Sequence, residues 1–400
     1  MTLLFKTQYL EAIKARYYNS TKKGKSQILD ELCKVTGYSR KHAIRVLAEG
    51  HMTGKKNSGR TIAYSQEARY HLKRLWHLMG RICSKKMVAA FPMWLEYYQR
   101  ADFTPLIKEE LLSMSSSSID RYLSSYKKQF VRMRRSGTRR SKKFNNIIPI
   151  KNFDHLASRP GYIQADTVAH CGTSLSGILM WSMTITDEFT GWTENRVTYG
   201  KGANNSLEAI VSAFSSLPFK PISFNSDNGS EFINKELHNY IARDSKIDFT
   251  RSRPYRKNDN AHVEQKNFTH VRELFGYERF DFKELELSMN NIYKNYFNIL
   301  HNFFIPQQKL ISKVRVGSRY IKKYDTPKTP YQRVMESKDI AKEKKLELKS
   351  KFDSFNPLLL KKELNQKMIE FKREHQSFKK KKRLLAEYYE KRSTKQSKAA

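Results

Sequence analysis

The feature that most constrains the fold is the alternation of strand and helix patterns in the middle of the chain. Three runs rich in β-branched and aromatic residues, bounded by glycines, predict consecutive strands at 161–170, 178–186 and 193–199. Turn residues between the second and third runs predict an antiparallel hairpin. Helix and strand patterns then alternate at 205–217, 222–225, 234–244 and 247–250, before a helix from about 261 to 275. This order predicts an α/β sheet with flanking helices.

The net charge of the chain is concentrated outside this central segment. The 400 residues contain 76 lysines and arginines against 39 acidic residues, a formal net charge of +37. Residues 151–300 nearly balance, with 17 basic and 18 acidic side chains, so the flanks carry the whole excess. Solvated surface lysines would explain why the protein is basic, but they would not explain why its central segment is almost neutral. The partition predicts basic flanks that bind a polyanion, above all double-stranded DNA.

The same composition argues against several other classes of protein. The longest apolar run, at 178–185, is far too short to span a bilayer. Charged residues interrupt the first 18 positions, where an export signal needs an unbroken apolar core. The three cysteines form no CxxC pair, which argues against a disulfide framework or a cysteine zinc site. We expect a cytoplasmic, nucleoid-associated bacterial protein with no membrane partner.

An early segment, 26–48, has the pattern of a helix, a turn and a second helix. A glycine breaks the first apolar face, and Ser39 can cap the second helix. If Ala43, Ile44 and Leu47 face inward, the basic side chains of the second helix are left to enter a DNA major groove. The alternative is an ordinary amphipathic hairpin with solvated charges. The candidate DNA contacts in this helix are Arg40, Lys41, His42 and Arg45.

The remaining flanks are helical and basic by their patterns. Residues 65–130 form a second helical block, a candidate second helix-turn-helix, in which Ser115 precedes a helix with amphipathic spacing. Between 127 and 143 nine basic residues occur without an acidic one, which predicts an arm along DNA phosphates or in a minor groove, or else a solvated linker. Short strands are expected near 314–324 and a charged helical tail at 338–400. The arm supplies the candidate DNA contacts Arg134, Arg135, Arg139 and Arg140.

Three acidic residues of the centre form a candidate catalytic set. Asp166 lies inside an expected strand, where an ionised carboxylate is costly unless it is paired or bound to a cation. Asp227 follows a strand in a loop, and Glu264 lies in the first turn of an expected helix. Taken singly, each has a structural explanation as a turn residue or a helix N-terminal charge. Brought together at one sheet edge, their oxygens would suit Mg²⁺.

The motifs around these acids resemble a known family. A strand aspartate, the run SDNGSEF at 226–232 and the run NDNAHVEQKN at 258–267 are similar to the DDE insertion-sequence transposases and retroviral integrases. Sixty residues separate Asp166 from Asp227, and 36 separate Asp227 from Glu264, close to the family's gap. The resemblance covers about residues 155–280. It implies a ribonuclease H-like fold, these three residues as catalytic ligands of two Mg²⁺ or Mn²⁺ ions, and attack by water or a DNA 3′-hydroxyl on a phosphodiester.

Other polar residues near the motifs are candidates for assisting roles. His170 and Asn228 are secondary candidates for contact with metal-bound water or phosphate, although such side chains more often make structural hydrogen bonds. Glu231 is assigned to the transition from loop to helix. The segment before and within the expected catalytic helix is suited to hold DNA phosphates, with a solvated loop as the alternative. Its candidate contacts are Arg251, Arg253, Arg256, Lys257, Lys266 and Asn267.

The sequence thus predicts an α/β ribonuclease H-like core with a mixed five-stranded sheet, preceded by all-α domains. We expect a DNA transposase or integrase that joins element 3′-hydroxyl ends to target DNA and acts at least as a dimer. The alternatives are a noncatalytic DNA-binding protein derived from a transposase and a metal-dependent ribonuclease H-like nuclease. The expected segments are a helix-turn-helix domain at 1–60, a second helical domain at 61–130, a basic linker at 131–150, the catalytic core at 151–300, a small β-rich module at 301–337 and a basic helical tail at 338–400.

Overall fold

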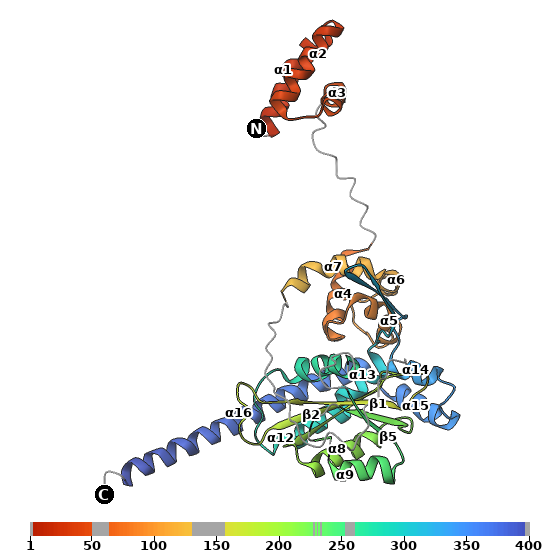
Figure 1. Ribbon diagram of the computed structural model, residues 1–400, viewed down its shortest axis with the longest axis vertical. Helices are drawn as coiled ribbons and strands as arrows, with labels where there is room; N and C mark the ends of the chain where they lie inside the picture. Colours follow the sequence, from red (N-terminus) through yellow and green to blue (C-terminus); the bar gives the residue numbers. More distant parts are fainter. Residues whose placement is uncertain are drawn as a thin grey trace. The chain divides into compact units, whose positions relative to one another are not determined.

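The computed structural model forms two compact units, Met1–Tyr64 and Ser65–Ala400 (Figure 1). Each unit has its own buried residues and is described separately below. The structure describes residues 3–49, 64–129, 157–226, 229, 231–232, 234–252 and 261–396. Asp227, Asn228 and the part of the expected basic arm from 130 to 143 therefore lie outside the described residues.

The first unit is a three-helix bundle, and its second and third helices lie where the pattern of helix, turn and helix at 26–48 predicts them. Thr21 caps the second helix, and Gly37 ends it with a φ of 74°, a left-handed conformation that glycine adopts without strain. The backbone N–H of His42 donates to Ser39 Oγ at 3.4 Å, which confirms the serine cap of the third helix. Leu32 lies at the centre of the core and is fully buried. The helices are α1 (Leu3–Tyr18), α2 (Lys22–Thr36) and α3 (Arg40–Glu49).

The expected inward face of α3 is wrong in one position. Ala43 and Leu47 are buried as expected, but Ile44 is 45% exposed and Val46 is buried in its place. A stripe with Ile44 and a stripe with Val46 both fit the helical repeat. The stripe that is buried, with Val46, is the one that packs in a common core with α1 and α2. Ile44 therefore lies on the outer face, between the exposed Lys41 and Arg45.

A four-helix block opens the second unit. Its core contains Trp76, Phe91 and Trp94, as the apolar pattern predicts, and Ser115 caps the last helix. The indole N–H of Trp94 donates to the carbonyl of Phe304 at 3.0 Å, so the block is joined to the rest of the unit through a buried contact. The helices are α4 (Gln66–Leu78), α5 (Ser84–Leu95), α6 (Pro105–Ser113) and α7 (Ser116–Lys128).

The centre of the second unit is the expected mixed five-stranded sheet, in the order β3-β2-β1-β4-β5. The first three strands pair antiparallel as a meander, and β4 and β5 add parallel to β1. Asp187 closes the β2–β3 hairpin by accepting hydrogen bonds from the backbone N–H groups of Gly161 and Thr190, which confirms the predicted turn. The strands are β1 (Tyr162–Ala169), β2 (Met180–Asp187), β3 (Thr193–Tyr199), β4 (Ser223–Ser226) and β5 (Asp248–Arg251).

Helices cover the sheet on both faces, and β2 and β3 are consequently buried along almost their whole length. In Figure 1, α8 and α9 lie below the strands and α13 lies above them. The helix expected at 261–275 consists of three segments, because a π-helical stretch interrupts it. The covering segments are α8 (Ala203–Phe214), α9 (Lys235–His238), η1 (Asn239–Asp244), α10 (Ala261–Lys266), η2 (Asn267–Arg272), α11 (Glu273–Phe275), α12 (Leu285–Ile292), η3 (Tyr293–Phe297) and α13 (Asn298–Phe304).

The last part of the chain adds a two-stranded ribbon and three helices. The long helix α16 packs on α12, η3 and α13, and its Leu360, Leu364 and Phe371 are buried. Figure 1 shows its second half extending past the sheet. None of the described helices is both long enough and apolar enough to cross a membrane. The elements are β6 (Leu310–Val316), β7 (Arg319–Tyr324), α14 (Pro330–Glu336), α15 (Lys342–Ser354) and α16 (Pro357–Gln396).

Candidate active site

The central strand β1 carries Asp166. The side chain is half-buried, and its strand lies between β2 and β4 in the sheet. Its Oδ1 accepts a hydrogen bond from the backbone N–H of Thr167 at 2.8 Å, and its Oδ2 accepts one from Asn267 Nδ2 at 2.7 Å. Both donors are neutral, so these two hydrogen bonds orient the carboxylate without neutralising its charge.

The parallel pairing of β1 with β4 brings the two aspartate motifs together in the backbone. Ala165 pairs with Ser226, and these residues directly precede Asp166 and Asp227 in the sequence. Neighbouring strands lie about 4.8 Å apart, and parallel strands end at the same sheet edge. The chain therefore enters the SDNGSEF motif beside Asp166.

The third motif lies on α10, which packs on β1 and β2. Glu264 belongs to this helix, although its side chain is outside the described part of the chain. One turn later, at Asn267, the helix widens into the π-helical segment η2, and Asn267 is the residue that donates to Asp166. Single π-helical turns are rare and frequently occur at functional sites. The helix carrying Glu264 is thus fixed against the strand carrying Asp166.

Glu231 connects the loop after β4 to the strand that carries Asp166. It is 2% exposed, and its Oε1 accepts hydrogen bonds from Thr167 Oγ1 at 2.5 Å and from Lys201 Nζ at 2.8 Å. A Cβ on Gly229 would lie 2.6 Å from the carboxylate carbon of Glu231, so glycine is required there for the side chain to fold back. Lys201 also lies over the ring of Trp181, 4.0 Å from its centroid.

These contacts of Glu231 were missed by the sequence reasoning, which placed the residue in a transition from loop to helix. Thr167 follows Asp166 directly, whereas Lys201 is 30 residues away from Glu231. No local pattern indicates such a pairing. The one available signal was the position of Glu231 inside the SDNGSEF motif.

The donor set around Asp166 fits a divalent cation with bound water. Asn267 Oδ1 and Glu231 Oε2 are buried and accept no hydrogen bond in the described structure. Buried acceptors without donors are costly, and the water shell of a metal ion would supply the missing donors. The described side chains alone contain no group of three His, Cys, Asp or Glu that could hold a metal, and those of Asp227 and Glu264 are not among them.

His170, a secondary candidate, lies in an apolar setting. The ring is fully buried between Phe275 and Phe280, and its Nε2 hydrogen-bonds with Ser182 Oγ at 2.7 Å. Burial, and secondarily the charge of Arg272, lowers the pKa of His170 to about 3. The neutral imidazole has no exposed surface with which to reach DNA. Asn228, the other secondary candidate, lies outside the described residues.

Three of the residues expected to contact phosphates in the core are described, and each is either buried or hydrogen-bonded to another residue of the protein. Arg251 and Lys266 are less than a tenth exposed, and Asn267 contacts Asp166. Burial, and then the charge of Lys86, lowers the pKa of Lys266 well below its ordinary value. The remaining core and arm candidates lie outside the described residues: Arg134, Arg135, Arg139, Arg140, Arg253, Arg256 and Lys257.

The candidates in α3 divide into two kinds. Arg40 forms an ion pair with Asp30 and donates to Ser26 Oγ at 2.6 Å, so it ties α3 to α2. Lys41 and Arg45 are exposed and follow the same outer face as Ile44, with spacings of three and four residues. His42 is half-buried, and its Nδ1 hydrogen-bonds with Nη2 of the exposed Arg45 at 3.0 Å.

The chain is similar to several known proteins. The family model described as integrase core domain matches residues 157–257. The uncharacterized protein y4rM of Sinorhizobium fredii is 36% identical over 341 residues, which cover 83% of this chain and 96% of that protein. The HTLV-2 integrase catalytic core domain in complex with magnesium is 19% identical, with 38% of this chain and 92% of that chain covered and a TM-score of 0.27. A simian T-cell lymphotropic virus intasome in complex with PP2A regulatory subunit B56 gamma is 17% identical, with 30% and 45% covered and a TM-score of 0.22.

The sheet order and the family match define an integrase-core protein with a ribonuclease H-like fold. More specifically, residues 157–257 form an integrase core domain, and the chain as a whole belongs to one family with the uncharacterized y4rM protein, 96% of which the match covers. This confirms the family and the fold class that the motifs predict.

Proposed function

We propose that the protein is the DNA transposase or integrase of an insertion sequence, with Asp166, Asp227 and Glu264 as the ligands of two Mg²⁺ or Mn²⁺ ions. The observation that carries the proposal is the β1–β4 pairing, which ends one residue before both aspartates. It is supported by α10, the helix of Glu264, which packs on β1 next to Asp166.

In this proposal the chain's residues divide the catalytic work between ligation and positioning. Asp166, Asp227 and Glu264 supply hard oxygen ligands, while Asn267 and Thr167 orient the first of them. Glu231 holds the loop that carries Asp227. Two bound ions would lower the pKa of the attacking oxygen, stabilise the leaving oxygen and offset charge in the transition state. No protein nucleophile is needed.

The basic flanks would hold the DNA while the core acts. The outer face of α3, with Lys41, Ile44 and Arg45, is suited to read an element end in the major groove, where an exposed aliphatic side chain can contact a thymine methyl. Joining two element ends requires two such recognition helices, so the proposal includes at least a dimer on DNA.

A cleavage and joining assay tests the proposal. The probes are duplexes that carry the DNA flanking the reading frame, supplied with a free 3′-hydroxyl and a plasmid target. We expect Mg²⁺-dependent cleavage and joined product, both abolished in Asp227→Ala. Asp248→Ala is the matched control, because Asp248 is an exposed acid on the same sheet.

The alternatives give different products in this assay. Cleavage without joined product would identify a nuclease with the same core. DNA binding without cleavage in either Mg²⁺ or Mn²⁺ would identify a noncatalytic DNA-binding protein. Cleavage that survives Asp227→Ala would refute the assignment of the site.

A further inference from the structure

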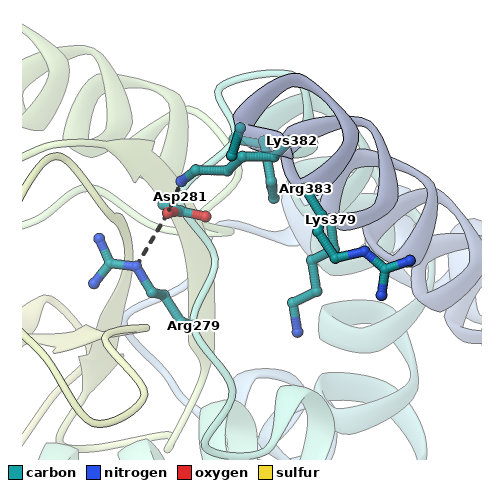
Figure 2. Close-up of a pocket in the computed structure, with 7 residues that line it drawn as sticks. Arg279, Asp281, Lys379, Lys382 and Arg383 are labelled. Carbon is teal, nitrogen blue, oxygen red and sulfur yellow. Dashed lines mark hydrogen bonds and ion pairs between the residues drawn. The ribbon is translucent and has the colours of Figure 1, made fainter. Parts of the chain in front are cut away.

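A basic pocket lies between the α16 helix and the segment that follows α11 (Figure 2). Its volume is about 330 Å³. Its lining combines the apolar Phe282 and Ala386 with four cationic side chains and one carboxylate. The charged residues of the lining are Arg279, Asp281, Lys379, Lys382 and Arg383.

One wall of the pocket is fixed to the catalytic sheet. Phe280 continues the ladder beyond β1 and β2, since its N–H donates to the carbonyl of His170 at 3.0 Å and its carbonyl accepts from the N–H of Met180 at 2.9 Å. Arg279 donates to the carbonyls of Ser174 and Ser176 at 2.7 and 2.6 Å. This wall is therefore part of the same rigid body as Asp166.

The other wall is one face of α16, held in place by a few specific contacts. Lys382 Nζ pairs with Asp281 Oδ2 at 2.9 Å, and Phe378 stacks on Phe282 with 5.4 Å between ring centroids. The pocket residues of α16 recur at spacings of three and four, so they form a single stripe along the helix. The pocket is thus preformed in the folded protein.

Lys379 and Arg383 are the cations of this pocket that can engage a ligand. Their side chains are 52% and 72% exposed, and Figure 2 shows them extending away from Asp281. Each has one acidic neighbour, at 3.4 Å, and exposed pairs of this kind contribute little free energy. Arg279 and Lys382, by contrast, already share Asp281.

We propose that this pocket binds a backbone phosphate of the DNA on which the core acts, through Lys379 and Arg383. The inference rests on the proposed function for the identity of the polyanion. An extended strand rises about 3.3 Å per residue, so Cys171, which pairs with Arg279, lies roughly 17 Å along the chain from Asp166. One duplex lying across both sites would contact the pocket about five base pairs from the reacting bond, since base pairs rise about 3.4 Å.

Salt-dependent DNA binding tests the pocket without requiring catalysis. The affinity of the full chain for a fluorescein-labelled random-sequence duplex is measured in EDTA, between about 50 and 200 mM salt. Each phosphate contact contributes about 0.9 to the slope of log affinity against log salt. We therefore expect the double variant Lys379→Gln/Arg383→Gln, which loses this one phosphate contact, to lower the magnitude of the slope by about 0.9.

The matched control is Lys380→Gln/Lys381→Gln, which removes the same charge from adjacent residues. These side chains point about 100° and 200° around the helix from Lys379, so they lie outside the stripe that lines the pocket. The proposal expects their slope to stay at the wild-type value, with thermal unfolding unchanged in both variants.

Two results would overturn the proposal: an equal fall of the slope in both double variants, which means general attraction to the helix, or no fall in either. The failure of the proposed function looks different. In that case cleavage is absent in Mg²⁺, whereas the binding slopes in EDTA still separate the two variants.

Discussion

Glu231 is an acidic residue beside the proposed metal site, and its carboxylate already binds side chains of the protein itself. Lys201 neutralises its charge, and Thr167 connects it to the residue next to Asp166. The carboxylate therefore acts on the site through the loop that it holds, with its second oxygen turned toward no described donor. In the proposed site, its role would be to position Asp227 before metal ions bind.

Glu231→Gln should raise the Mg²⁺ concentration that gives half-maximal cleavage by about tenfold, which corresponds to about 1.4 kcal/mol. The amide keeps the size of the side chain but leaves Lys201 without its ion pair, so the loop is held less firmly. Lys201→Met combined with Glu231→Gln removes both charges and should recover part of the thermal stability, because no unpaired cation remains. A Mg²⁺ requirement that does not change in Glu231→Gln would show that the contact is only structural.

Glu188 gives the fold a pH dependence. Burial raises its pKa from 4.5 to about 7, with a smaller contribution from Asp187, while a hydrogen bond from Gln164 opposes the shift. The folded state thus binds a proton that the unfolded state has released, and this contribution to stability is lost as the pH rises from about 4.5 to about 7. Glu188→Gln should be more stable than wild type at pH 8 by about 1–3 kcal/mol, with no difference near pH 4.5.

Urea unfolding at several pH values measures this difference. Glu343→Gln, an exposed acid on α15, serves as the control and should follow the wild-type profile. A constant stability difference between Glu188→Gln and wild type across the pH range would contradict the ionisation of Glu188 as its cause.

At the residue scale, the sequence indicates a candidate site residue only where a side chain is chemically unusual for its position. Asp166 was recognisable because a carboxylate inside an apolar strand is costly. Glu231 was not, since its contacts come from Thr167 and Lys201, which lie 64 and 30 residues away. The lowered pKa of Lys266 likewise could not be predicted from its neighbours in the sequence, because its causes are burial in the fold and the charge of Lys86, 180 residues away.

Among the elements, α3 carries the exposed face to which we assign DNA recognition in the proposed function. Its inner face is fixed by Ala43, Val46 and Leu47, and Arg40 is used to hold α2. Substitution of Lys41 and Arg45 by Gln should weaken binding to all DNA, with a slope of log affinity against log salt smaller by about 1.8. Lys22→Gln/Lys34→Gln is the control with the same charge change on exposed positions of α2.

Ile44 makes a separate prediction for the same helix. Ile44→Ala should leave the salt dependence unchanged but cost about 1–3 kcal/mol of binding to element-end DNA alone, because an apolar contact reads bases and not phosphates. Titration of end and random duplexes at one salt concentration measures the difference. Equal losses on the two duplexes would mean that Ile44 does not contact bases.

The elements themselves were predicted from periodicity, and their departures from it have physical causes. The helix expected at 261–275 exists, but a π-helical turn divides it and places His270 and Val271 together in the core. The sequence shows only which residues are apolar, whereas the wider turn comes from packing against β1 and β2. Ile44 was misplaced for a related reason, since two helical stripes fit the same residues.

The whole molecule consists of two compact units, and each has its own buried core among the described residues. The α4–α7 block belongs with the catalytic sheet, because Trp94 is fully buried and donates to the carbonyl of Phe304. Calorimetry of the full chain should therefore show two thermal transitions, one for each unit.

Core truncations should move these transitions one at a time. Leu32→Ala costs about 2–5 kcal/mol and should lower only the transition of the first unit, by roughly 10 °C or more for so small a domain. Trp94→Ala costs about 3–5 kcal/mol and should lower the other transition as a single step. If α4–α7 folded independently of the sheet, Trp94→Ala would instead split that transition into two, with the sheet melting at its original temperature.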